Sequence, residues 1–341
     1  MNTSWLAFLE TQSARFDQYQ ASFAPPQEET RNAATGTVLV PLTHLGLISI
    51  GGEEAAEFLH KLGSNDVKTL AADRAQYNSL NSAKGRMLAS FLVWRSGDDF
   101  RLALAADLQS TIARKLSMYV LRSKVKVTEV SDRVLLGLAG PQAATLLASI
   151  GLNAPAGTLS VSQGESLVTH LDGERYILET DAIKAESLWT ALCANGAQPA
   201  GSSAWNWLDI QAGIPLVSLR TQDEFVAQML NFELLGGVSF TKGCYPGQEI
   251  VARTQYLGKL KKRMFRGHTA DESAVELGTN VYAPEFGEQS CGKVVAIEAA
   301  PQGGRDLLAV MQISAFEAGE VHLGTPAGPR LELASLPYSI D

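Results

Sequence analysis

One short stretch of the chain combines a nucleophile, a cation and turn-forming residues. Its residues, in order, are Lys242, Gly243, Cys244, Tyr245, Pro246, Gly247, Gln248 and Glu249. Glycine reaches backbone angles closed to other residues and proline fixes one dihedral angle, so this stretch is predicted to be a shaped loop near solvent. The ammonium of Lys242 would favour the Cys244 thiolate, the reactive and metal-binding form of cysteine. An inert, partly buried cysteine is the alternative interpretation.

The remaining cysteines and the histidines show no metal-binding pattern. Cys193 and Cys291 lie far from Cys244 in the sequence, no C-x-x-C pair occurs, and the five histidines include no i, i+4 pair. This spacing is neither a disulfide framework nor a zinc site. We therefore expect no resident metal, while a transient metal contact through Cys244 stays open.

A run of basic residues follows the loop. Six lysines and arginines fall within 14 residues: Arg253, Lys259, Lys261, Lys262, Arg263 and Arg266. The run has three interpretations: a solvated strand and turn, a cationic rim for an anionic ligand beside Cys244, or an RNA-binding surface. The net charge of −8 disfavours a general nucleic-acid binder, so we expect no direct nucleic-acid partner.

Length and composition limit the class of protein. A chain of 341 residues suggests two or three domains, and 45% hydrophobic with 19% charged residues is typical of a soluble globular protein. No apolar run approaches the roughly 20 residues that cross a bilayer, and no signal-peptide pattern is present at the N-terminus. We expect a cytoplasmic monomer without a membrane partner.

Mixed helices and strands precede the loop. The sequence predicts a helix over residues 4–19, an irregular arm over 20–37 and a hairpin over 87–105, followed by alternating strands and helices up to residue 212. Hairpins rather than regular βαβ units favour an α+β fold. After residue 260, short alternating segments separated by glycine and proline predict a small antiparallel barrel or sandwich.

Two tryptophans lie two positions apart in a predicted helix. Trp205 and Trp207 therefore point to different faces of that helix. One can join the core while the other lines a cleft, where an aromatic wall would stack on a planar heterocycle. The alternative is that both tryptophans belong to the core.

The loop and its surroundings resemble the YgfZ-like folate-binding proteins, relatives of the glycine-cleavage T-protein that support iron–sulfur enzymes. The resemblance covers about residue 38 to the end. Its central part runs from Gly236 and Gly237 through the loop to Val251-Ala252-Arg253. Further matches are Asn231, Ala212-Gly213-Ile214-Pro215, Lys84-Gly85-Arg86 and Leu336-Pro337-Tyr338-Ser339.

The resemblance implies a ring-like, multi-domain T-protein fold with a tandem α+β folate-binding body and a C-terminal antiparallel β-barrel. It divides the chain into a discontinuous folate-binding domain (residues 1–48 with 126–255), a second α+β domain (49–125) and a barrel (260–341). It also implies tetrahydrofolate or a one-carbon derivative as cofactor and iron–sulfur enzymes as partners. Trp205, Asn231 and Arg253 would hold the folate, and Cys244 would be the working thiol, assisted by Lys242.

Several residues depart from the family pattern. True aminomethyltransferases carry paired aspartates where this chain has Ala89 and Ser90, and neither replacement can act as a carboxylate. Tryptophan and proline positions of some relatives are occupied by Leu45 and Ala227. We expect a folate-binding accessory protein of iron–sulfur enzymes, with an indirect effect on tRNA modification. The alternative is a folate-dependent one-carbon transferase with an unknown acceptor.

Overall fold

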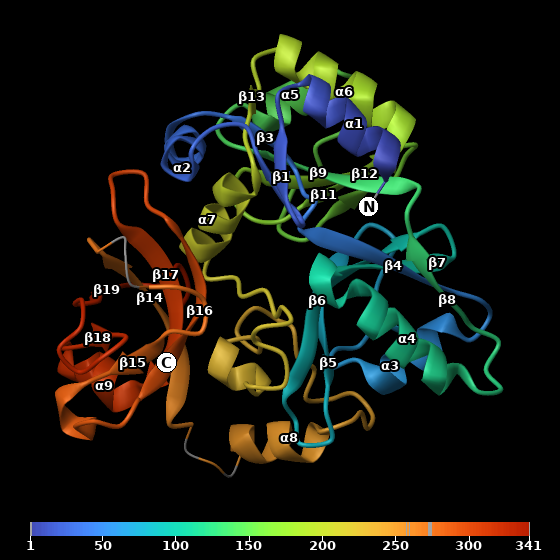
Figure 1. The fold of residues 1–341 in the computed structure, drawn as a ribbon. Coiled ribbons are helices and arrows are strands. Elements are labelled where there is room, and N and C mark those ends of the chain that lie inside the picture. Colours follow the sequence, from blue (N-terminus) through green and yellow to red (C-terminus); the bar gives the residue numbers. More distant parts are fainter. Residues whose placement is uncertain (1, 257, 259, 272–274, 341) are drawn as a thin grey trace.

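Three lobes, each built on its own sheet, surround the centre of the molecule in the computed structural model (Figure 1). The structure describes residues 2–256, 258, 260–271 and 275–340. This arrangement of mixed helices and sheets confirms the predicted α+β class.

The first lobe, at the top of Figure 1, contains a six-stranded sheet of order β10-β11-β12-β9-β3-β13, in which only the β13–β3 pair is parallel. Its strands are β3 (Val38–Pro41), β9 (Arg133–Ala139), β10 (Val161–Ser162), β11 (Leu167–His170), β12 (Arg175–Asp181) and β13 (Gln198–Pro199). Its helices are α1 (Thr3–Thr11), α2 (Pro26–Thr35), α5 (Ala143–Ser149), α6 (Ala182–Ala194) and α7 (Ser202–Ala212).

The second lobe contains a five-stranded antiparallel sheet of order β5-β6-β7-β4-β8. Its strands are β4 (Leu45–Gly51), β5 (Ala75–Asn81), β6 (Met87–Ser96), β7 (Asp99–Ala105) and β8 (Lys126–Val130). Its helical segments are α3 (Ala55–Leu62), η1 (Ala106–Leu108) and α4 (Gln109–Val120). The segment from Val217 to Val251, which includes η2 (Ala227–Leu230) and the start of α8 (Gln248–Tyr256), contributes buried side chains to the core of this lobe.

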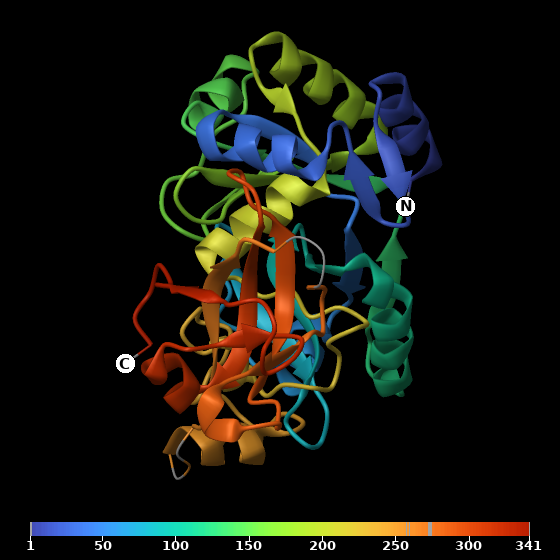
Figure 2. The same cartoon turned by 60° about the vertical axis from the view of Figure 1, so that its left-hand side comes forward.

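The third lobe is a curled antiparallel sheet of order β18-β15-β16-β17-β14-β19, drawn in orange and red in Figures 1 and 2. Its strands are β14 (Lys262–Thr269), β15 (Asn280–Tyr282), β16 (Gly292–Ala299), β17 (Arg305–Gln312), β18 (His322–Leu323) and β19 (Glu332–Ala334). The segments η3 (Pro284–Phe286) and α9 (Ile313–Ala318) accompany it. Alternating buried and less buried residues along β14 fit a strand with one face in a core.

The N-terminal segment differs from the sequence prediction. The helix ends at Thr11, shortly before Ser13, which adopts φ 72°, and the chain then forms a hairpin of β1 (Arg15–Asp17) and β2 (Gln20–Ser22). The predicted irregular arm contains α2, which begins at Pro26 and has two glutamates in its first turn. Proline and acidic residues are both favourable at a helix N-terminus, so these residues could have predicted the start of α2.

Two strands, β8 and β14, begin close to limits of the predicted domains. Strand β14 begins at Lys262, next to the predicted start of the C-terminal domain. Strand β8 pairs with β4, however, so residues 126–130 share a sheet with residues 45–51. The division by residue number stays a prediction.

A buried carboxylate links the first two lobes. Glu179 on β12 is fully buried and accepts a hydrogen bond of 2.8 Å from the Trp94 indole on β6. Arg101 and Arg133 each lie 3.3 Å from the same carboxylate. Because a buried charge is costly unless it is paired, these contacts fix the relative position of the two sheets that flank the centre.

Helix α7 connects the first lobe to the third, as both ribbon views show (Figures 1 and 2). Trp205 packs so closely on β9 that a Cβ at Gly137 would lie 2.4 Å from its ring. Trp207 instead donates its indole N–H to Asp306 of β17 over 2.7 Å. The helix ends at Gly213, whose left-handed conformation (φ 66°) suits glycine. The two tryptophans thus point to different neighbours, as their spacing predicted.

Candidate functional site

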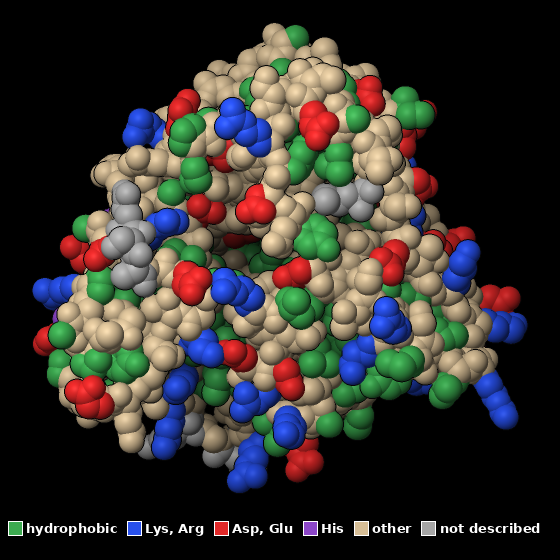
Figure 3. Space-filling view, in the orientation of Figure 1, with side chains coloured by type: hydrophobic (Ala, Val, Ile, Leu, Met, Phe, Trp, Pro, Cys, Tyr) green, Lys and Arg blue, Asp and Glu red, His purple; other side chains and the backbone are tan. Residues whose placement is uncertain are grey.

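A cleft that is open to solvent lies between the first two sheets and α7. Figure 3 shows this face of the molecule hollowed near its middle, where the lobes meet. The residues that line the cleft are Leu45, Tyr77, Ser90, Phe91, Leu92, Ala103, Leu171, Ile177, Trp205, Asp209, Ile214, Pro215, Leu216 and Phe232.

Aromatic side chains form much of the cleft wall. Trp205 lines the cleft, but it is only 1% exposed and therefore also belongs to the core. Tyr77 on β5 meets Phe232 edge to face, with ring centroids 6.2 Å apart. Rings fixed by a surrounding core present flat apolar surfaces to a planar ligand.

An ion-pair group centred on the buried Arg175 borders the cleft through Asp209. Arg175, at the start of β12, donates to Asp209 of α7 over 2.6 Å and makes a two-point contact with Asp172 over 2.6 and 2.8 Å. The Arg175 guanidinium also lies 5.6 Å from the centre of the Trp205 ring. The guanidinium therefore fixes the Asp209 carboxylate against the aromatic wall.

Two polar groups of the cleft remain available for a ligand. Within the described residues, the second carboxylate oxygen of Asp209 and the hydroxyl of Tyr77 have no hydrogen-bond partner. Burial raises the pKa of Asp209 to about 6, although Arg175 opposes this shift, and burial also raises the pKa of Tyr77. At neutral pH the cleft thus offers an ionised acceptor and a neutral hydroxyl.

Sequence reasoning did not assign Tyr77, Arg175 or Asp209 to the site. They come from β5, β12 and α7, so only the fold brings them together. Of the residues discussed from the sequence, five line the cleft: Leu45, Ser90, Trp205, Ile214 and Pro215. Ala89 is fully buried. The Ser90 hydroxyl accepts the backbone N–H of Val217 over 2.9 Å.

Asn231 and Arg253, two residues predicted to hold folate, are not among the residues that line the cleft. Asn231 is fully buried with φ 54°, and its amide nitrogen donates to the carbonyl of Met264 over 2.8 Å. Its oxygen accepts from Arg263 over 3.2 Å, so the side chain joins η2 to β14. Arg253 is exposed on α8. The roles of both residues in holding folate stay predictions.

The cysteine loop packs against the turn between β5 and β6. Gly247 has φ 78°, and a Cβ there would lie 2.4 Å from the carbonyl oxygen of Ser82 and 2.6 Å from Gly85 Cα. Glycine is thus required at 247, and the loop shape is fixed by backbone contact. Cys244 is free and exposed, as the turn-forming residues predicted.

Tyr245 and the first residues of α8 follow the cysteine. Tyr245 is buried, which raises its pKa to about 12. Gln248 begins the helix, and Glu249 lies in its first turn, where a carboxylate is favourable. The loop is therefore held on both sides of the exposed thiol.

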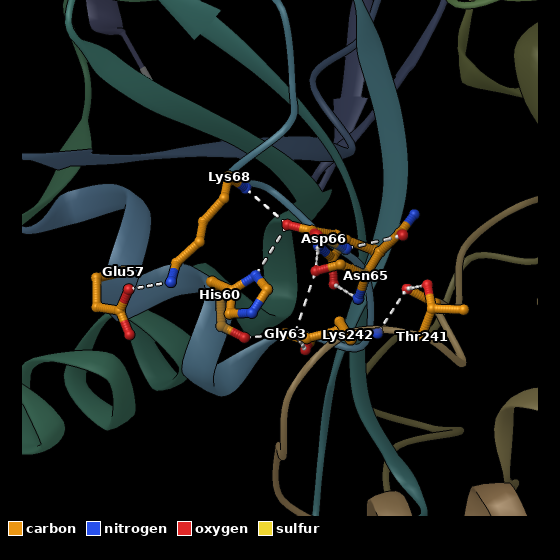
Figure 4. Close-up of polar contacts among 10 residues, drawn as sticks. Glu57, His60, Gly63, Asn65, Asp66, Lys68, Thr241 and Lys242 are labelled. Atoms are coloured by element: carbon orange, nitrogen blue, oxygen red, sulfur yellow. Dashed lines mark hydrogen bonds and ion pairs between the residues drawn. The ribbon is translucent and has the colours of Figure 1, made fainter.

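Lys242 anchors the loop to the end of α3 (Figure 4). Its ammonium donates to the backbone carbonyls of His60, of Gly63 over 2.5 Å and of Asn65 over 3.2 Å. Burial lowers the pKa of Lys242 to about 8, and the charge of Asp66 opposes this shift. Three carbonyls use its three N–H donors, so these contacts give Lys242 an anchoring role. Its effect on the Cys244 thiolate stays a prediction.

The basic run does not form one continuous surface. Arg263 pairs with Glu233 over 2.7 Å, and Arg266 donates to Gln211 over 2.6 Å, so both are used in internal contacts. Lys261 is exposed, and Lys259 lies outside the described residues. In Figure 3, Lys and Arg side chains gather along the lower edge of the face, in the region of α8.

The described residues contain no group of three or more His, Cys, Asp or Glu side chains that could hold a metal ion. Within the same residues, no helix combines the length and the apolar character needed to cross a bilayer.

Known proteins resemble this chain in sequence and in fold. The GCVT N-terminal domain family matches residues 7–160. A "tRNA-modifying protein YgfZ" from Yersinia pseudotuberculosis serotype O:1b is 33% identical over 250 residues, which are 72% of this chain and 75% of the relative. The protein of the same name from Edwardsiella ictaluri is 31% identical over 319 residues, 89% of this chain and 94% of the relative.

A solved structure confirms the likeness of fold over the whole chain. The glycine cleavage system aminomethyltransferase T from Bartonella henselae superimposes with a TM-score of 0.83 over 99% of this chain and 98% of that protein. Its sequence identity is 18%, so this likeness concerns the fold alone.

Proposed function

The chain belongs to the YgfZ family, and from that premise we propose that it binds tetrahydrofolate or a one-carbon derivative and supports iron–sulfur cluster enzymes. The relatives are named for tRNA modification. An effect of this chain on tRNA modification would follow indirectly, through an iron–sulfur client enzyme.

The cleft carries this proposal. A pterin ring is flat, and the aromatic wall formed by Trp205, Tyr77 and Phe232 offers surfaces on which such a ring can pack. The pyrimidine edge of a pterin presents adjacent N–H donors. The Asp209 carboxylate, fixed by Arg175, would accept them as charge-assisted hydrogen bonds.

The exposed cysteine loop supports the second half of the proposal. No loop residue lines the cleft, so the thiol is accessible to a macromolecule while folate occupies its own site. Cys244 would act there as a nucleophile, a transient cluster ligand or a redox thiol. These chemistries share one requirement, a reactive thiolate.

Classical aminomethyl transfer is disfavoured by the residues of the cleft. Ser90 lines it without a carboxylate, and its hydroxyl is held by Val217. A serine in that environment cannot provide the anionic base that the transfer needs.

A complementation experiment tests the proposal. In cells that lack this protein, the wild-type chain should restore iron–sulfur enzyme activity, while Cys244→Ser and Asp209→Asn should not. Cys193→Ser, which changes a half-buried thiol outside the loop, is the matched control and should restore it fully. Full rescue by Cys244→Ser would refute the role of the thiol, and full rescue by Asp209→Asn would refute the role of the cleft.

A further inference from the structure

A histidine and an aspartate form a fixed pair beside the cysteine loop (Figure 4). His60 is on the last turn of α3, and its Nδ1 lies 2.9 Å from Oδ1 of Asp66. The same carboxylate oxygen accepts the backbone N–H of Lys68 over 2.9 Å. The imidazole side chain is only 12% exposed. A carboxylate held in this way places the imidazole proton on Nδ1 and leaves Nε2 as the basic nitrogen.

That basic nitrogen faces the loop. A Cβ built on Gly243 would lie 3.9 Å from His60 Nε2 and would meet nothing else within 4 Å. The backbone of Gly243 is not in the left-handed region, so its conformation does not require glycine. The absence of a side chain instead keeps the space between Nε2 and the loop open. Within the described residues, Nε2 has no hydrogen-bond partner.

The loop cannot easily leave this position. Lys242 donates to the carbonyl of His60 itself and to that of Gly63, so the residue before Gly243 is fixed to the helix end that carries the imidazole. Cys244 follows Gly243, and consecutive Cα atoms are about 3.8 Å apart. The loop therefore holds the exposed thiol one residue beyond the contact with Nε2. Hydrogen bonds between catalytic groups are often long in a free protein and tighten when a ligand binds.

We propose that His60, positioned by Asp66, is the base that ionises Cys244. The thiol proton moves from Sγ to Nε2, which gives a thiolate and an imidazolium without a change in net charge. Asp66 stabilises the imidazolium, and the proton returns to sulfur when the thiolate is released. A cysteine, a histidine and an orienting acid in this order form a recurring nucleophilic arrangement. The assignment rests on the proposed function, because it explains how the working thiol is activated.

Other charged groups near the pair are occupied. The Lys242 ammonium donates hydrogen bonds to backbone carbonyls. Lys68 forms an ion pair with Glu57, whose carboxylate also lies 3.3 Å from the Lys61 ammonium. The charged groups labelled around the imidazole in Figure 4 are Glu57, Asp66, Lys68 and Lys242. Among these residues and His60, only His60 has a basic nitrogen without a hydrogen-bond partner.

The pH profile of thiol alkylation tests this inference in the intact protein. Iodoacetamide labelling of Cys244, followed by peptide mass spectrometry between pH 5 and 10, should show a reactive population at neutral pH. His60→Gln should slow labelling at pH 7 by about tenfold, because the thiol would then have no neighbouring base to accept its proton. At pH 10, where the thiol is ionised in both proteins, the two rates should be equal.

Matched variants make the result decisive. Asp66→Asn should slow labelling at pH 7 less than His60→Gln does. His170→Gln should have no effect, because both ring nitrogens of His170 already bond to carbonyls, of Gly157 and Gly173. Equal pH profiles for the wild type and His60→Gln would overturn the inference, as would a rate reduced equally at every pH, which indicates a merely structural role.

The labelling needs neither folate nor a client enzyme. If Cys244→Ser fails in cells while His60→Gln leaves the alkylation profile unchanged, the proposed function stands and only the assigned base is wrong. If Cys244→Ser rescues fully while His60→Gln shifts the profile, the base assignment stands and the proposed role of the thiol is wrong.

Discussion

The cleft and the cysteine loop are built in opposite ways. The cleft takes its polar residues from β5, β12 and α7, and holds them by buried ion pairs and aromatic packing. The loop is a continuous stretch whose shape is set by glycine contacts and by Lys242 on three carbonyls. This difference fits the proposal that the cleft is a preformed small-molecule site, whereas the loop presents a thiol to solvent.

The largest effect should come from removing the cation of the cleft. Arg175→Met would leave the partly exposed Asp209 and Asp172 without their buried partner, and the loss of hydrogen bonds between charged groups costs about 1.5–3 kcal/mol. Urea denaturation should show a loss of this size, together with a loss of folate binding. The exposed Arg114→Met should change stability by less than about 0.5 kcal/mol. A stable Arg175→Met protein that still binds folate would contradict the preformed cleft.

The next largest effect is expected in the pH dependence of folate affinity. The pKa of Asp209 is about 6, so the carboxylate is ionised above this value and is protonated as the pH falls below it. If the ionised form accepts the pterin donors, folate affinity should fall about tenfold per pH unit below pH 6. Asp209→Asn should bind about 10–100-fold more weakly at pH 7.5, the equivalent of 1.5–3 kcal/mol for a hydrogen bond to a charged group. Its affinity should not change between pH 5 and 8. Identical pH profiles for the two proteins would exclude Asp209 from the folate site.

A loop variant sharpens the contrast with the cleft. Lys242→Met would leave three carbonyls without their donor, and the expected loss of stability is about 1–3 kcal/mol. Folate affinity should change less than twofold, because no loop residue lines the cleft. Limited proteolysis should cut the loop faster than in the wild type. A parallel loss of folate binding would mean that the two regions act as one site.

The smallest expected effect is a gain in folate affinity. Leu45 lines the cleft where some relatives carry tryptophan, so Leu45→Trp should add a stacking surface. An aromatic contact contributes about 0.5–1.5 kcal/mol, which corresponds to roughly two- to tenfold tighter folate binding. Leu219→Trp, at an exposed leucine outside the cleft, is the control and should leave affinity unchanged. Weaker binding by Leu45→Trp would show that the cleft has no room for a second indole.

The same contrast explains what could be predicted from the sequence. The exposed cysteine loop was visible because its residues are contiguous and their turn-forming character is local. The α+β fold and the curled C-terminal sheet followed from hairpin and strand patterns and from the resemblance. The partnership of Tyr77, Arg175 and Asp209 could not be predicted, because their separation in the chain conceals a contact that only the sheets create. The pairing of His60 with Asp66 was missed for a related reason, since it depends on how α3 ends.

A titration of the anaerobic protein with tetrahydrofolate, followed by intrinsic tryptophan fluorescence, tests the central claim most directly. The cleft account predicts saturable quenching in the wild type and in Cys244→Ser, with markedly weaker binding in Asp209→Asn. Absence of saturable binding in the wild type, or unchanged binding in Asp209→Asn, would contradict it.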